Sequence, residues 1–497
     1  MLTLAILSPL LGALILAFAT GLHERAARTL AVALSAVPLV LLAAVWIGFD
    51  ASPGAPQFQA VAEVPWVPSL DVGWRVGVDG MSLALALMSA LLFLASIAWP
   101  ADVRGRPRAY YAWFLFLEGV SLGLFLVLDL LLFYVFFDLS LVGMYFLIGR
   151  WGHGEAERAA LKFFIYTLAG SLAFLLAILG LVLASPQGLT FDMRVLIEMQ
   201  PLTGTGLYAS LVLLGFLVGF AVKTPLFPFH TWLPPAHVDA PGPASAILAG
   251  VLLKMGTYGM VRIPFSMMTE TFAAYALPLG IVAVISILWG AIVAFGQGNL
   301  KRRIAYTSVN HMGYTVLGIA AAGALVSGEA AAREMALTGA VVEMIAHGLI
   351  TGALFLIAGA FWQRGETYDL DAYGGLAATA PRLTGATVLA AFASLGLPGL
   401  AGFVAEFQIF AGTFAIYPWL AGIGLIGILI TAALFLTMLQ QLFFGPLPPR
   451  WSRLPDLGRS EGAVLAVLLV LVVVIGVYPA WLLTVIDSAS AVIVGAG

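Results

Sequence analysis

Long apolar runs separated by short polar segments follow one another along the whole chain of 497 residues. A helix needs about 20 apolar residues to cross the hydrocarbon core of a bilayer. Fourteen runs approach this length and predict transmembrane helices at residues 2–19, 29–49, 80–99, 109–127, 129–149, 160–184, 207–226, 243–263, 272–295, 303–324, 335–361, 384–413, 415–444 and 461–485. The pattern is therefore typical of an all-α polytopic membrane protein with about fourteen transmembrane helices.

The basic residues in the loops test this count, because inner loops of membrane proteins carry an excess of Lys and Arg. Alternate loops, taken as inner from the one after the first span, hold sixteen of the 22 basic residues: Arg25, Arg28, Arg104, Arg106, Arg108, Arg150, Arg158, Lys162, Lys301, Arg302, Arg303, Arg364, Arg382, Arg450, Arg453 and Arg459. The outer loops hold Arg75, Arg194, Arg262 and Arg333. This asymmetry predicts that both termini lie on the outer side.

The first apolar run, residues 2–19, has an alternative interpretation. No basic segment precedes it, but Ala17-Phe18-Ala19 fits the small-residue pattern of a signal-peptide cleavage site. We interpret the run as a retained transmembrane helix, because the charge asymmetry of the loops requires it.

Composition narrows the class of function. The chain is 62% hydrophobic and 9% charged, whereas soluble domains carry about 25% charged residues. A net charge of −3 argues against nucleic-acid binding. The chain has no cysteine, which excludes disulfides, thiolate metal sites, iron–sulfur clusters and cysteine catalysis. No nucleotide-binding loop or cofactor motif is present, so we expect no cofactor and no metal ion in this chain.

Two of the predicted spans are interrupted. The seventh runs into KTPLFP (223–228), and the twelfth contains GLPGLAG (396–402). Proline and glycine free backbone groups that hydrocarbon cannot satisfy, so such breaks survive only inside protein or beside water. Broken helices in both halves of a chain point to inverted repeats with the ion site at the break. We therefore expect two inverted five-helix repeats with broken helices 7 and 12.

This expectation divides the chain into four parts. Residues 1–108 hold helices 1–3 with an outer loop, 109–263 the first repeat, 272–444 the second repeat, and 445–497 an inner loop with helix 14. In the repeats, Asp138 would correspond to a position near His311, and Lys223 to Glu406.

Ionisable residues lie inside several apolar spans. A charge at the centre of a bilayer costs about 2.5–3.5 kcal/mol on insertion scales, and such residues usually mark ion or proton pathways. The principal set is Asp138, Lys223, Lys254, His311, His347 and Glu406, with Glu118 and Glu343 as secondary candidates and Asn310 and Tyr258 as nearby polar groups. Any one of these could be a structural side chain. A series spread over both halves and flanking the breaks predicts a proton relay.

The residue types suit that relay. An Asp138–Lys223 pair could act as a switch, because a nearby carboxylate stabilises the ammonium and its withdrawal favours release of the proton. Imidazoles suit intermediate steps, and Glu406 beside its break could pass protons to outer water. Nothing in the chain supplies the energy for transport, so a partner or a second ion gradient must drive it.

Two other clusters have simpler interpretations. His230, His237 and Asp239 in PFHTWLPPAHVDAP could suggest a metal site, but the segment is broken by proline and the histidines are seven residues apart. We expect them to cap and hydrate the inner mouth. The run Lys301-Arg302-Arg303 is interpreted as an ordinary topology-determining cluster.

Four segments resemble a known family. They are FAVKTPLFPFHTWLPPAHVDAPGPASAILAGVLLKMGTYGMVR, SVNHMGYTVLGI, MIAHGLITGALFLIAGA and LPGLAGFVAEF. The chain resembles the antiporter-like subunits of respiratory complex I over its whole length, and in particular the M-type chain of the bacterial NADH–quinone oxidoreductase. An acid at Glu406, rather than the lysine of L-type, N-type and Mrp-type chains, favours the M-type.

The resemblance implies roles for individual residues. Lys223 matches the broken-helix lysine, Lys254 the central lysine, His311 and His347 histidines of the central hydrophilic axis, Glu406 the terminal acid and Glu118 a further acid of span 4. Two departures stand out. FFDLSLVGMYFLIG has Asp138 and Gly143 where the family has glutamate and proline, and Glu343 stands where the family often has a neutral residue. The shorter Asp138 could lose direct contact with Lys223.

The resemblance implies a proton-translocating, non-redox subunit of a NADH:quinone oxidoreductase in a bacterial inner membrane. It would move protons outward beside L-type and N-type partner chains in a hetero-oligomer, with redox chemistry in other subunits. An Mrp-type cation/proton antiporter subunit, the membrane arm of an energy-converting hydrogenase or ferredoxin-driven relative, and a stand-alone solute transporter stay open as alternatives.

Overall fold

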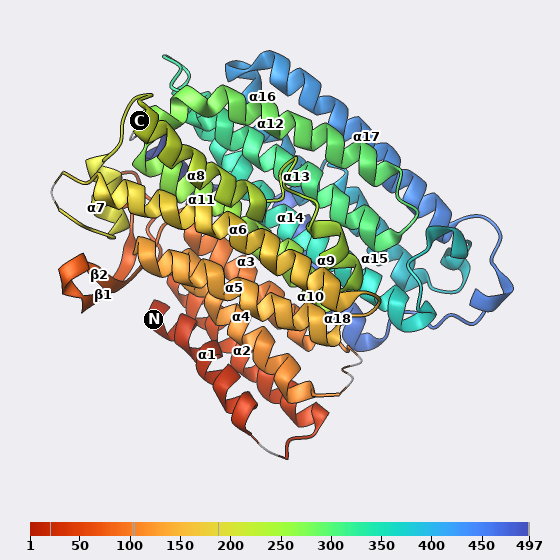
Figure 1. The fold of residues 1–497 in the computed structure, drawn as a ribbon. Helices are drawn as coiled ribbons and strands as arrows, with labels where there is room; N and C mark the ends of the chain where they lie inside the picture. Colours follow the sequence, from red (N-terminus) through yellow and green to blue (C-terminus); the bar gives the residue numbers. More distant parts are fainter. Residues whose placement is uncertain (20, 102, 104, 187, 496–497) are drawn as a thin grey trace.

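The computed structural model describes residues 1–19, 21–101, 103, 105–186 and 188–495, and Arg104 lies outside these ranges. Long helices run side by side in one bundle, and a small antiparallel hairpin lies at one end of it (Figure 1). The helices are α1 (Leu2–Phe18), α2 (Glu24–Ile47), α3 (Gly80–Ala98), α4 (Pro107–Leu126), α5 (Leu130–Trp151), α6 (Ala156–Leu183), α7 (Met193–Met199), α8 (Leu207–Lys223), α9 (Leu233–Asp239), α10 (Gly242–Ile247), α11 (Leu253–Met260), α12 (Thr269–Phe295), α13 (Leu300–Gly323), α14 (Ala330–Gly365), α15 (Pro381–Ser394), α16 (Ala401–Ile416), α17 (Pro418–Phe443), α18 (Arg459–Val477) and α19 (Ala480–Gly495). The strands are β1 (Gln59–Val67) and β2 (Val72–Val78), and the π-helical turns η2 (Leu248–Leu252) and η3 (Val261–Phe265) flank α11.

The predicted polytopic helical architecture is confirmed. Ten of the described helices, counting α10 to η3 as one, are long and apolar enough to cross a membrane. The four other predicted spans are occupied by α1, α8, α13 and the pair α15–α16. Both termini lie at the end of the bundle that carries the hairpin and α7 (Figure 1). This placement agrees with an even number of crossings.

The loop between α2 and α3 contains the hairpin β1–β2. Two local predictions need correction. The last span, expected as one helix over 461–485, is interrupted between Val477 and Ala480, because Pro479 has no N–H to donate and its ring clashes with the preceding turn. Arg262, assigned to an outer loop, is fully buried in η3.

The hairpin is fixed to the bundle by a cluster of charges in which Asp129 and Asp192 are buried. Arg75 of β2 contacts Asp129 at 3.0 Å and Asp192 at 3.4 Å, and it also pairs with Asp71. Asp129 is the N-cap of α5 and accepts hydrogen bonds from Leu131 and Leu132. One guanidinium therefore ties the hairpin to the start of α5 and to the loop before α7.

Both predicted helix breaks are present, between α8 and α9 and between α15 and α16. Between α8 and α9, Trp232 donates its indole N–H to the Val222 carbonyl at 2.9 Å, and the Phe227 amide donates to Ser286 at 2.8 Å. Between α15 and α16, Gly396 and Gly399 adopt φ of +76° and +92°, a conformation that favours glycine. Hydrogen bonds to side chains thus satisfy two backbone groups at the first break, and glycine lets the chain turn out of the helix at the second.

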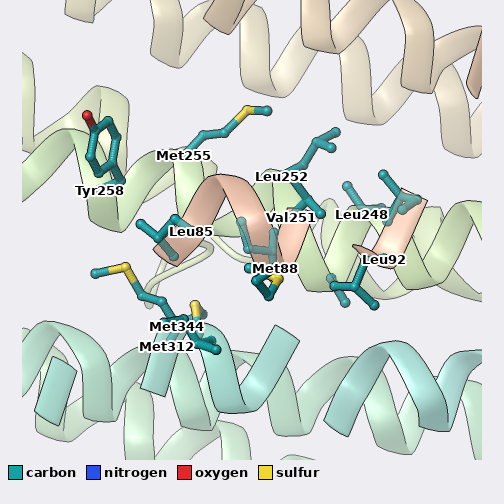
Figure 2. Packing of buried hydrophobic residues seen from close by; sticks show 14 of the residues in the cluster. Leu85, Met88, Leu92, Leu248, Val251, Leu252, Met255, Tyr258, Met312 and Met344 are labelled. Atoms are coloured by element: carbon teal, nitrogen blue, oxygen red, sulfur yellow. The ribbon is translucent and has the colours of Figure 1, made fainter. Parts of the chain in front are cut away.

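The backbone of the segment α10–η2 crosses the backbone of α14 in close contact, and glycines occupy the points of contact. A Cβ on Gly242 would lie 2.9 Å from the Gly359 Cα, and a Cβ on Gly250 would lie 3.1 Å from the Gly348 carbonyl oxygen. Figure 2 shows the apolar side chains that surround this crossing, with Met88 and Leu92 of α3 beside η2. Small residues let helix backbones approach closely in membrane proteins. The crossing joins the two halves of the chain.

This crossing predicts that a single added methyl group is destabilising. In Gly348→Ala the new Cβ would lie 2.8 Å from Met88 Sδ and 2.9 Å from the Gly250 carbonyl oxygen. We expect a loss of about 1–3 kcal/mol in the free energy of unfolding, as for other overpacked cores, measured by thermal unfolding of the purified protein in detergent.

Gly422→Ala on the exposed face of α17 is the matched control, because nothing lies within 4 Å of its Cβ. The control should be neutral or slightly stabilising, since alanine favours helix over glycine by about 1 kcal/mol. Equal behaviour of the two variants would show that the crossing tolerates a methyl group.

Candidate functional site

Lys254 lies at the centre of the bundle, where the two halves of the chain meet. It is fully buried on α11, between the two π-helical turns. Its Nζ donates to the Ala249 carbonyl at 2.6 Å and lies 2.6 Å from Nδ1 of His347 on α14. Two states share this heavy-atom geometry: an ammonium donating to Nδ1, or an Nδ1–H donating to a neutral amine. The contact can therefore pass one proton between the two side chains with little movement.

The buried row continues from His347 into the second half of the chain. The rings of His347 and His311 are 5.3 Å apart between centroids. His311 Nδ1 lies 3.1 Å from Glu343 Oε1, and its Nε2 lies 3.2 Å from Ser394 Oγ. All these side chains are less than 5% exposed. The histidine predicted from sequence is thus held between a carboxylate on α14 and a hydroxyl at the end of α15.

Glu406 lies on the far side of the second helix break. It is buried on α16, one turn after the break, and its carboxyl group packs against Gly396 so closely that a Cβ there would lie 2.1 Å from Oε2. Ser394, which contacts His311, is the last residue of α15, so Ser394 and Glu406 lie on opposite sides of the break along the chain. Leu397 is 41% exposed, so the break also reaches the surface of the chain.

Lys223 forms a separate group in the first half. It ends α8 at the first break, is buried, and donates to Ser140 Oγ at 2.7 Å. Its Nζ also lies 4.8 Å from the centre of the Phe137 ring. Asp138 forms no hydrogen bond or ion pair with Lys223, and its Oδ1 has no partner in the part of the chain that the structure describes. The structure therefore pairs the Lys223 ammonium with Ser140, and Asp138 takes no part in this hydrogen bond.

Glu118 stands apart from the row. It is fully buried on α4 and accepts a hydrogen bond from Ser35 of α2 at 3.0 Å. The polar candidate Asn310 also bonds outside the row, because its side-chain amide donates to the Thr431 hydroxyl at 2.6 Å. The structure thus brings Lys254, His347, His311 and Glu343 together, with Glu406 across the break.

The end of the bundle opposite the hairpin contains polar groups whose burial the sequence did not indicate. Lys301, interpreted as part of an ordinary basic cluster, is fully buried and donates to the Ala240 carbonyl. Its neighbour Arg302 is exposed, as expected of such a cluster. A cavity of about 750 Å³ opens beside this region and is lined by His153, Trp362 and Tyr368, among others. Lys301 and Arg303 of the run therefore belong to the interior.

The predicted histidine cluster is dispersed. His230 accepts from the Trp289 indole at 3.1 Å, whereas His237 stacks on Phe355 with 4.3 Å between ring centres. Among the described residues, no group of three His, Asp or Glu side chains has the arrangement of a metal site. Sequence analysis also missed Ser140 and Ser394, because a serine in an apolar helix carries no signal that separates a relay partner from an ordinary packed residue.

Both the sequence and the fold of this chain are similar to those of known proteins. Residues 127–431 match the family described as "NADH:quinone oxidoreductase/Mrp antiporter, TM". The NAD(P)H-quinone oxidoreductase chain 4 2 of Trichodesmium erythraeum (strain IMS101) is 36% identical, over 96% of this chain and 89% of the relative. A chain of respiratory complex I from Thermus thermophilus with bound NADH is 32% identical, with a TM-score of 0.87 over the full length of both chains.

A chain of the Mrp complex from Dietzia sp. DQ12-45-1b has a TM-score of 0.84 over 99% of this chain and 96% of that one. At 20% identity, this likeness concerns the fold alone. Taken together, the matches show that this chain belongs to the family of transmembrane subunits shared by NADH:quinone oxidoreductases and Mrp antiporters.

The cavity of about 750 Å³ beside His153 gives a prediction about pH. His153, in the loop between α5 and α6, stacks on Trp362 with 4.0 Å between ring centres. Burial, with the Lys301 ammonium as the second cause, lowers the pKa of His153 to about 4. The unfolded chain, with a pKa of about 6.5 at this side chain, binds the proton first. Acidification below about 6.5 therefore destabilises the folded state, and this effect stops growing below about 4.

His153→Phe should keep the stacking on Trp362 and lose this acid sensitivity. Thermal unfolding at pH 7 and pH 5 checks the expectation: the difference between the two midpoints should be smaller in the variant than in the parent. His23→Phe, at an exposed position, is the control and should leave the difference unchanged.

Proposed function

We propose that this chain is a proton-translocating membrane-arm subunit of a NADH–quinone oxidoreductase. The observation that carries the proposal is the 2.6 Å contact between Lys254 and His347, from which the buried row leads through His311 to the break at Glu406. The relative from T. erythraeum bears the name NAD(P)H-quinone oxidoreductase chain 4 2, and the T. thermophilus chain is part of a respiratory complex I. A conduit of titratable groups fits such a subunit.

The row would move a proton by exchange between neighbours. Lys254 gives its proton to Nδ1 of His347 across the short contact. His347 passes a proton to His311, whose ring centroid is 5.3 Å away, and Glu343 stabilises the imidazolium that forms on His311. Ser394 then hands the proton across the break toward Glu406. Each step needs side chains that bind and release protons, which lysine, histidine and carboxylates do.

Lys223 and Asp138, in the first half of the chain, would control the time at which Lys254 receives a proton. With Lys223 bonded to the neutral Ser140, its ammonium lacks direct stabilisation by a carboxylate. Movement of Asp138 toward Lys223 would stabilise the charged form, and withdrawal would release the proton. The position of Asp138 would thus act as the switch expected from the sequence. The inverted repeats at 109–263 and 272–444 belong to this proposal, since each contains one helix break with an ionisable residue beside it.

The driving energy must come from partner subunits. Moving one charge through 100 mV takes about 2.3 kcal/mol, and the sequence has no motif for NADH, flavin or an iron–sulfur cluster. We propose that this subunit carries no redox centre and that coupling enters laterally, through surfaces such as the exposed break beside Glu406. The excess of basic residues in one set of loops supports an orientation with both termini on the outer side of a bacterial inner membrane.

An Mrp-type cation/proton antiporter subunit is the second candidate. The fold does not separate the two functions, because the Mrp chain has nearly the same TM-score. The relative named as a quinone oxidoreductase chain is more similar in sequence, at 36% identity against 20% for the Mrp chain. The carboxyl of Glu406, where the resemblance implies lysine for Mrp-type chains, also favours the oxidoreductase.

The role of Lys223 predicts that Lys223→Ala abolishes or strongly reduces proton pumping while the complex still assembles. Without the ammonium, the first half has no proton to hold or release. Pumping is measured in membrane vesicles as NADH-driven acidification, with assembly checked on native gels. Lys162→Ala, at an exposed position on α6, is the matched control. Pumping at the parental rate in Lys223→Ala would remove this residue from the relay.

The role of Asp138 predicts a contrast between two substitutions. Asp138→Glu keeps a titrating carboxyl group and extends it by one methylene, so it should retain pumping. Asp138→Asn removes the negative charge at nearly the same size, so it should reduce pumping strongly. The same vesicle assay compares the two variants. Equal rates in both would show that no titrating acid is needed at this position.

A further inference from the structure

A buried ion pair lies outside the proposed relay. Arg262 in η3 pairs with Asp79, the N-cap of α3, and both side chains are at most 1% exposed. Arg262 Nε donates to the Tyr258 hydroxyl at 3.2 Å, and its guanidinium lies 5.0 Å from the centre of the Phe58 ring. Asp79 also accepts from the Ser82 amide at 2.8 Å. The pair is thus fixed from several directions.

The pair lies on the same helical face as Lys254. Lys254, Tyr258 and Arg262 are spaced four residues apart, so their side chains follow one another along the helix. Tyr258 donates its hydroxyl to the Phe125 carbonyl at 3.2 Å and accepts from Arg262. A polar column therefore runs from the central lysine toward the end of the bundle that carries the hairpin.

A cavity at the hairpin end of the bundle reaches Asp79, the partner of Arg262 in this column. It has a volume of about 560 Å³ and is lined by the loop 49–59, by Asp79 and by Asp487 and Ser488 of α19, among others. Asp79 thus faces the cavity while it pairs with Arg262 behind it. Within the described part of the chain, Tyr258 and this pair stand between the outer cavity and the lysine that the relay depends on.

The chemistry of the pair decides between two roles. As a relay step, Asp79 would have to take up a proton, which would leave the Arg262 guanidinium buried without its counter-ion, a costly state. Arginine itself does not release its proton in proteins. A fixed positive charge in a narrow polar path repels protons and other cations, as in other selective pores. The pair therefore suits a barrier and not a carrier.

We propose that the Arg262–Asp79 pair is an electrostatic seal that stops protons from returning through the outer cavity to Lys254. The proposal rests on the proposed function, because a seal matters only if Lys254 carries protons. Arg262 acts here as a positioning residue for the field along the path, and Asp79 holds it in place. With this entrance closed, protons that reach Lys254 can leave only along the row toward Glu406.

Passive proton leak in vesicles that contain the assembled complex tests the seal. A pH gradient, acidic on the outer side, is imposed without NADH, and its decay is followed with a pH-sensitive dye. Arg262→Gln keeps a side chain that can donate to Asp79 and removes the charge, so the gradient should decay several-fold faster. Arg262→Lys keeps the positive charge, so the gradient should decay at the parental rate. Arg194→Gln, which removes an outer ion pair with Asp192 and Glu63, is the matched control and should stay tight.

Two further variants separate the seal from a structural role. If Arg262→Gln alone does not assemble, the neutral pair Arg262→Gln with Asp79→Asn avoids an unpaired carboxylate and should assemble and leak. Adding Lys254→Met to the leaking variant should close the leak, because the path would lose its acceptor. A leak that persists without Lys254, or an assembled neutral variant as tight as the parent, overturns the proposal.

NADH-driven pumping in the same vesicles distinguishes this outcome from failure of the proposed function. A tight Arg262→Gln complex whose pumping still depends on Lys223 would reject only the seal. A complex whose pumping is indifferent to Lys223 would reject the relay, whatever the leak.

Discussion

The close crossing of α10–η2 and α14 is the constraint on which the site depends. The backbones meet at Gly242 and Gly359 and again at Gly250 and Gly348, where no side chain larger than hydrogen fits without movement. This approach brings Lys254 from one half of the chain onto His347 from the other. In hydrocarbon no water can replace a lost partner. The distance between the helices therefore sets whether two ionisable groups share a proton or stand as isolated buried charges.

The chain uses two kinds of buried charge in different ways. Three ion pairs of the described residues combine arginine with a carboxylate in largely buried positions: Arg75 with Asp129, Arg262 with Asp79 and Arg364 with Glu461. A guanidinium keeps its proton in proteins, so these pairs can fix elements without titrating. The proposed relay uses lysine and histidine, bonded to hydroxyls, carbonyls and each other, with Glu343 as the one carboxylate in direct contact. Neutral partners leave these groups free to change their charge.

Irregular backbone lies at or beside three residues of the proposed relay, whereas His311 and His347 lie in the continuous helices α13 and α14. Lys223 ends its helix at one break, Glu406 follows another, and Lys254 lies between two π-helical turns. π-helical turns are rare and are often found at functional sites. Each irregularity frees or redirects backbone carbonyls. The Ala249 carbonyl in η2 shows the effect, since it accepts a hydrogen bond from the Lys254 ammonium five residues later. At Lys254, the departure from regular helix thus supplies a partner for the buried charge.

The sequence by itself determined the number of spans, both helix breaks and which residues carry titratable groups inside the membrane. These features are local: an apolar run must cross the bilayer, proline and glycine must interrupt a helix, and a lysine between leucines must be buried. The tertiary structure decided the partners. That Lys223 meets Ser140 and not Asp138, that Arg262 and Lys301 belong to the interior, and that Glu118 lies apart depends on how helices distant in the chain pack. Such packing is fixed by sub-ångström fit between side chains and glycine gaps, which a linear pattern does not contain.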